Sequence, residues 1–94
     1  MAHPQVKVLF FASAREAAGT SSVTITLESK KEEGSGVEIG STARSLVAQL
    51  SATYPYLDFE KDQISVAVNK QYIEEDVVLK DGDEVALLPP IAGG

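Results

Sequence analysis

The sequence predicts an α+β domain in which one main amphipathic helix packs on one face of a mixed sheet of four to five strands. Four short segments carry the alternating apolar pattern of strands, and one longer segment carries apolar residues at helical spacing. Glycine or proline residues separate these segments. A chain of 94 residues supports a single core, and one helix laid across one sheet buries the apolar faces of both.

The first two elements are a strand and a short helix. Residues 5–11 alternate between two sets of side chains and are predicted to form a strand. A helix is predicted over residues 14–18, because Ser13 and Glu16 have the spacing of a capping box. Gly19 suits the left-handed position that follows a helix.

A second strand is predicted at residues 22–27, with Val23, Ile25 and Leu27 on one face. The next segment, residues 28–40, combines a run of lysines and glutamates with three glycines. This composition is typical of a surface loop. The alternative is that the segment has a regulatory or partner-contacting role.

The main helix is predicted to begin after a cap at Ser41 or Thr42 and to run to about residue 53. Pro55 ends it, because the residue before a proline avoids the α region. One apolar stripe at helical period faces the predicted core, and it consists of Ala43, Leu46, Val47, Leu50 and Tyr54.

The last third of the chain completes the sheet. Residues 64–69 predict a third strand, residues 70–73 a short edge segment and residues 84–88 the last strand. A tight turn is predicted at Asp81 and Gly82. This order of elements is that of the β-grasp, or ubiquitin-like, architecture, in which the first and last strands are central parallel neighbours. We therefore predict a β-grasp domain over residues 1–88 and a flexible tail over residues 89–94.

Composition excludes several classes of function. The net charge of −6 disfavours binding to a phosphate backbone, so no nucleic-acid partner is expected. The chain has no cysteine and its one histidine is His3, which excludes disulfides, thiolate metal sites and a catalytic triad. No signal peptide or membrane span is predicted, and a cytoplasmic protein is expected. The acidity serves either solubility or steering toward a basic patch on a partner.

Alternation along the strands divides the sheet into two faces. The helix is expected to cover the face that holds Val8, Phe10, Val66, Val68, Val85 and Leu87. Apolar residues at the alternate positions would form one exposed patch on the other face, and exposed apolar patches mark partner sites. This predicted patch consists of Leu9, Phe11, Ala67, Ala86 and Leu88. The alternative is that Leu9 and Phe11 lie under a loop or under the short helix.

The last six residues read PPIAGG and have no strand or helix pattern. Two prolines favour an extended stem, and six extended residues reach about 20 Å. The two glycines have no Cβ, so the backbone can pass a narrow channel and approach a ligand closely. The final carboxylate could then be activated as an acyl adenylate and converted by a sulfur nucleophile to a thiocarboxylate. The alternative is a frayed end without function.

Three blocks of sequence resemble one known family. They are VKVLFFA at residues 6–12 with Arg15, Glu16 and Gly19, QISVAVN at residues 63–69, and DGDEVALLPPIAGG at residues 81–94. Together they are similar to the small, sulfur-carrier subunit of molybdopterin synthase, a ubiquitin-like β-grasp family. The segment of residues 28–40 is longer than is usual in that family.

The resemblance implies a function in molybdenum cofactor biosynthesis. A ubiquitin-activating-type enzyme would use ATP to adenylate Gly94, and a sulfurtransferase step would give the thiocarboxylate. The large subunit, in a heterotetramer, would then pass the sulfur to cyclic pyranopterin monophosphate to build the dithiolene of molybdopterin. Catalysis would lie on the large subunit, so whether this chain counts as an enzyme stays open, and it would bind no cofactor itself. The insertion path would be lined by Leu88, Pro89, Pro90, Ile91 and Ala92, with Gly93 next to Gly94.

Three other interpretations remain. The chain could be a sulfur carrier for the thiazole of thiamine, although the two prolines before the tail disfavour this. It could be a ubiquitin-related modifier that thiolates transfer RNA and conjugates to lysines. It could also be an interaction module with a passive tail, in which case deletion of Gly94 would leave its function intact.

Overall fold

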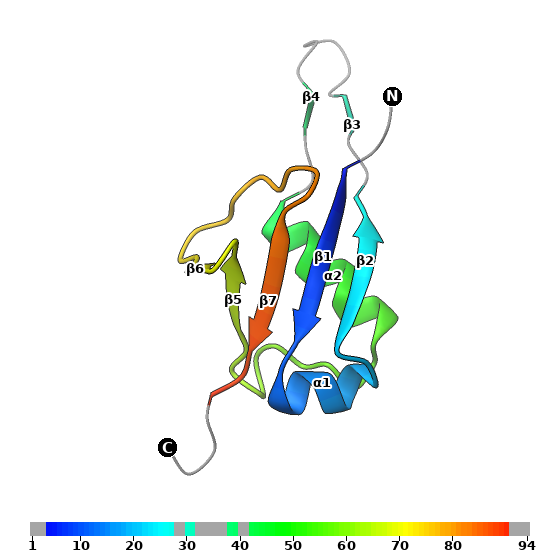
Figure 1. The fold of residues 1–94 in the computed structure, drawn as a ribbon, viewed down its shortest axis with the longest axis vertical. Coiled ribbons are helices and arrows are strands. Elements are labelled where there is room, and N and C mark those ends of the chain that lie inside the picture. The colour runs from blue at the N-terminus through cyan, green and yellow to red at the C-terminus, as the bar shows by residue number, and fades with distance from the viewer. Residues whose placement is uncertain (1–3, 28–29, 32–37, 40–41, 91–94) are drawn as a thin grey trace.

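The computed structural model describes residues 4–27, 30–31, 38–39 and 42–90 (Figure 1). The described residues form two helices and seven strands. Their bounds are β1 (Gln5–Phe10), α1 (Ala12–Ala18), β2 (Ser22–Thr26), β3 (Lys30–Lys31), β4 (Glu38–Ile39), α2 (Ala43–Thr53), β5 (Ser65–Val68), β6 (Gln71–Tyr72) and β7 (Glu84–Leu88).

Five of these strands form one mixed sheet in the order β2-β1-β7-β5-β6. The central strands β1 and β7 are parallel, and the other neighbours are antiparallel. The helix α2 lies across one face of this sheet, and α1 crosses the end at which β1 and β7 finish (Figure 1). The predicted β-grasp is confirmed, with five strands and a second helix.

The predicted loop at residues 28–40 differs in part from the structure. Within it, β3 and β4 pair as a short antiparallel ladder of two residues each, apart from the main sheet. The rest of that segment lies outside the described residues.

The core fills the space between the sheet and α2. Three residues of the predicted helix stripe are buried, and Val47 and Tyr54 are half-buried. The Tyr54 ring meets the edge of Phe10 at a centroid distance of 5.4 Å, a geometry that aromatic pairs prefer. The inward strand positions supply the other wall of the core, with Val8, Val85 and Leu87 fully buried.

The capping box predicted for α1 is wrong. The helix begins at Ala12 with Phe11 as its N-cap, and no side chain caps it. The Phe11 carbonyl already accepts hydrogen bonds from the amides of Ala14 and Arg15. Ser13 therefore lies inside the first turn of the helix, and a residue at that position cannot act as the N-cap. The prediction for the other end is confirmed, because Gly19 adopts the left-handed conformation with φ 76°.

The N-terminus of α2 is hydrogen-bonded to the segment before β7, which is distant in the sequence. Thr42 is the N-cap, and Thr42 and Ser45 form the reciprocal pair of a capping box. Two further amides of the first turn are satisfied from the segment before β7: Ala43 donates to the Val77 carbonyl and Arg44 to Asp76 Oδ1, both at 2.8 Å. These bonds hold residues 76–77 against the helix.

A tight turn sets β7 beside β1. Gly82 has φ 87°, a left-handed conformation that glycine adopts without strain. The Asp81 carboxylate accepts the Gln5 amide, and the Gly82 amide donates to the Gln5 carbonyl, both at 2.8 Å. The start of β1 and the turn before β7 are therefore bound together, which fixes where β7 enters the sheet beside β1.

Candidate functional site: the outer face of the sheet and the base of the tail

The face of the sheet opposite α2 carries a row of apolar side chains. Leu9 pairs with Ala86, Ala86 with Ala67, and Ala67 with Tyr72, so the row crosses β1, β7, β5 and β6. Residues paired across a ladder point to the same face of a sheet. The predicted division of the two faces is thus confirmed by the register.

The next row toward the tail contains Phe11 and Leu88. Leu88 pairs with Ser65, and Phe11 directly follows Phe10, which is the last paired residue of β1 and lies opposite Leu87. Phe11 is 44% exposed, whereas Leu88 is half-buried. The alternative that Phe11 is covered by a loop or by α1 is therefore wrong, while Leu9 is half-buried.

Ala67 is an exception to the predicted exposure. Only 4% of its surface is exposed, although it lies in the row between Ala86 and Tyr72. Tyr72, which the sequence patterns missed, is 70% exposed and pairs with Ala67. Alternation could have placed Tyr72 on this face, but a strand of two residues is too short to show a period.

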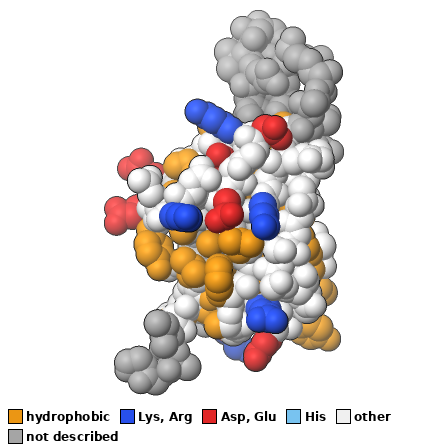
Figure 2. Space-filling model, viewed as in Figure 1, with side chains coloured by type: hydrophobic (Ala, Val, Ile, Leu, Met, Phe, Trp, Pro, Cys, Tyr) orange, Lys and Arg blue, Asp and Glu red, His pale blue; other side chains and the backbone are white. Residues whose placement is uncertain are grey.

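We call this surface the outer apolar patch, and Figure 2 shows hydrophobic side chains gathered over this part of the face. A charged row borders it on the side away from the tail, where Lys7 and Glu84 pair across the ladder. The outer apolar patch comprises Leu9, Phe11, Tyr72, Ala86 and Leu88, with Ala67 beneath them.

The tail begins at the opposite border of the outer apolar patch. Leu88 is the last residue of β7, Pro89 is half-buried and Pro90 is exposed. Neither proline can donate a ladder hydrogen bond, which is why the strand ends here. The predicted tail residues Ile91, Ala92, Gly93 and Gly94 lie outside the described residues.

Among the described residues, no three His, Cys, Asp or Glu side chains are grouped so that they could hold a metal ion. None of the described helices has the length and apolar character needed to cross a bilayer.

Comparison with known proteins places the chain in a family. The model of the ThiS family matches residues 8–94. The chain belongs to the ThiS family. The match includes the last strand, the outer apolar patch from Leu9 onward and the tail, so the family resemblance predicted from the sequence is confirmed.

Three proteins similar to this ThiS-family chain are each named molybdopterin synthase sulfur carrier subunit. The protein from Chlamydomonas reinhardtii is 38% identical over 92 residues, which cover 96% of this chain and 99% of the relative. The human protein is 34% identical over 93 residues, with coverage of 96% and 94%. The Escherichia coli protein is 35% identical over 89 residues, with coverage of 95% and 99%.

Two solved structures have the same fold as this ThiS-family chain. Small archaeal modifier protein 1 from Methanosarcina acetivorans superposes with a TM-score of 0.70 at 28% identity, covering 98% of each chain. A chain from the complex of subunits 1 and 2 of the molybdopterin-converting factor of Helicobacter pylori superposes with a TM-score of 0.61 at 25% identity, covering 96% of this chain and 99% of that one.

Proposed function

We propose that this chain is the sulfur-carrier subunit of a molybdopterin synthase and acts in the cytoplasm. Its Gly94 carboxylate would attack ATP on an activating enzyme, releasing pyrophosphate and forming an acyl adenylate. A sulfur nucleophile would then displace AMP, so that one oxygen of the carboxylate is replaced by sulfur. The carrier itself would bind no cofactor, and ATP would be bound by the activating enzyme.

The second half of the cycle would take place on the large subunit. The thiocarboxylate sulfur would attack an oxygen-bearing carbon of cyclic pyranopterin monophosphate that becomes part of the dithiolene, and the carbon–oxygen bond there would break, so that the oxygen leaves with the phosphate or as water. Hydrolysis of the acyl–sulfur bond then leaves the sulfur on the pterin and returns the Gly94 carboxylate. Two such transfers supply the two sulfurs, and two small and two large subunits would form the working heterotetramer.

The observation that carries this proposal is the position of the outer apolar patch at the base of the tail. Leu88 belongs to the patch, and Pro89 follows it directly, so a partner that covers the patch also contacts the base of the tail. The prolines limit the freedom of the stem, which reduces the entropy lost when the tail enters a pocket. The shared name of relatives that align over nearly the whole chain supports the choice of partner.

The test is a thiocarboxylation assay with the intact chain, ATP, an activating enzyme and a sulfur donor. Mass spectrometry should find one oxygen exchanged for sulfur at Gly94. The matched control carries one extra alanine after Gly94, which should fold normally and remain unmodified because its terminal carboxylate belongs to another residue. An unchanged mass of the intact chain, in an assay that modifies a known carrier, would contradict the proposal.

One second candidate has specific support. The similarity to small archaeal modifier protein 1 favours a ubiquitin-like modifier that is joined through its C-terminus to lysines. In that case, incubation with ATP and cell extract should give isopeptide adducts of this chain that contain Gly94. The carrier proposal expects the thiocarboxylate in their place.

A further inference from the structure

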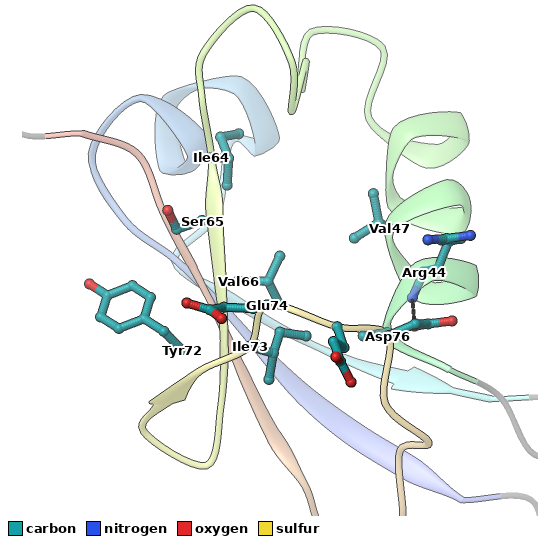
Figure 3. Close-up of a pocket in the computed structure, with 11 residues that line it drawn as sticks. Arg44, Val47, Ile64, Ser65, Val66, Tyr72, Ile73, Glu74 and Asp76 are labelled. Carbon is teal, nitrogen blue, oxygen red and sulfur yellow. Dashed lines mark hydrogen bonds between the residues drawn. The ribbon is translucent and has the colours of Figure 1, made fainter.

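A groove lies on the other side of the β5–β6 edge, between α2 and the segment that follows β6 (Figure 3). Its volume is about 490 Å³. Apolar side chains form its floor, and Val47 from the helix and Val66 from the strand point toward each other across it (Figure 3). The floor consists of Ala43, Val47, Ile64, Val66 and Ile73, most of them half-buried.

The wall of this groove is held at both ends. At one end, the Ile73 amide donates to the Val66 carbonyl at 3.1 Å. At the other, Asp76 accepts the Arg44 amide, and Val77 accepts the Ala43 amide. Glu74 and Glu75 lie between these anchors, so their backbone is positioned before any partner arrives. A preformed site loses less entropy on binding than one that must be ordered.

The rim of the groove is acidic. Glu74, Glu75 and Asp76 are exposed and line it in sequence, and Arg44 is the one cationic side chain among the lining residues. Asp76 is charged at neutral pH like any exposed aspartate, and the hydrogen bond from the Arg44 amide lowers its pKa further below the ordinary value of 3.8. Apolar floor and acidic rim together match a segment that presents aliphatic and cationic side chains side by side.

The groove and the outer apolar patch meet at the sheet edge. Tyr72 belongs to the patch and also lines the groove, and Ser65, which lines the groove, pairs with Leu88. A protein that covers the patch and takes the tail therefore needs only to reach around β6 to fill the groove. A second copy of this chain is a poor occupant, because two grooves placed together would oppose their carboxylates.

We propose that this groove is a second docking site for the large subunit, filled by a segment in which a lysine or arginine stands beside an aliphatic side chain. This inference rests on the proposed function, since it assigns the groove to the partner that receives the tail. The large subunit then holds the carrier on both sides of the β5–β6 edge, and the acidic rim steers the encounter.

The test is a charge reversal on the rim. The variant Glu74→Lys/Glu75→Lys and the control Glu16→Lys/Glu60→Lys change the net charge equally, and all four positions are exposed. Glu16 and Glu60 do not line the groove. Affinity for the cognate large subunit is measured by titration calorimetry at low and high salt, after circular dichroism has shown that both variants are folded.

We expect the rim variant to bind about tenfold more weakly than the control at low salt, with a smaller difference at high salt. Equal affinities of the two variants, whether both fall or neither does, would overturn the groove as a docking site. That outcome leaves the proposed function standing if the wild-type chain binds. Failure of the wild-type chain to bind the large subunit would instead contradict the proposed function itself.

Discussion

Replacement of Phe11 by alanine should show how much the outer apolar patch, as distinct from the rest of the surface, contributes to binding of the large subunit. A phenylalanine side chain has a surface of about 200 Å². Phe11 is 44% exposed, so about 90 Å² remains for a partner to cover at about 25 cal/mol per Å². Its truncation should therefore weaken binding to the large subunit by about 2 kcal/mol, or about thirtyfold in Kd.

The control for this prediction is an aromatic residue of similar size off the sheet. Tyr56 is 82% exposed and lies in the segment after α2. Tyr56→Ala should bind the large subunit as the wild-type chain does. The extended backbone of Phe11, with φ −122° and ψ 150°, is open to alanine, so Phe11→Ala should fold. Titration calorimetry measures both affinities, and an equal loss in the two variants would refute a special role for the patch.

Two further predictions concern the fold. Leu50→Ala removes a side chain with no exposed surface from α2. It should lower the free energy of unfolding, measured in urea, by about 3 kcal/mol. A loss below about 1 kcal/mol would mean that the core collapses around the site. Asp76→Asn keeps an oxygen for the Arg44 amide but removes the charge. Because the folded-state pKa of Asp76 lies below its ordinary value of 3.8, the wild-type chain should be the more stable at neutral pH, and this advantage should shrink as the pH falls below 3.8. Acid denaturation curves that stay parallel through that range would contradict the assignment.

Residues with a clear period were predicted correctly because the period itself carries the information. Val85 and Leu87 point to the core, and Ala86 and Leu88 point to the outer face, as strict alternation requires. The same holds for α2, whose stripe begins at Ala43 and ends at Tyr54. Where a strand is long enough to show its pattern, the pairing with its neighbours only confirms the face.

The features that were missed depend on contacts between distant parts of the chain. The start of α1 moved to Ala12 because the turn out of β1 uses the Phe11 carbonyl, and local cap preferences do not include that turn. The acidic groove exists because Asp76 reaches Arg44 across 32 positions of sequence. Neither residue belongs to a motif, so only the folded chain brings the rim to the helix.

The strand β7 connects the core to the outer apolar patch. Its buried positions, Val85 and Leu87, have no exposed surface, so the core fixes the direction in which the strand runs. The intervening positions, Ala86 and Leu88, lie on the outer face, and Pro89 follows Leu88 directly. The position of Pro89, where the stem begins, is thus set by packing on the opposite face of the sheet. A partner that covers the outer apolar patch therefore also contacts the residue at which the stem begins.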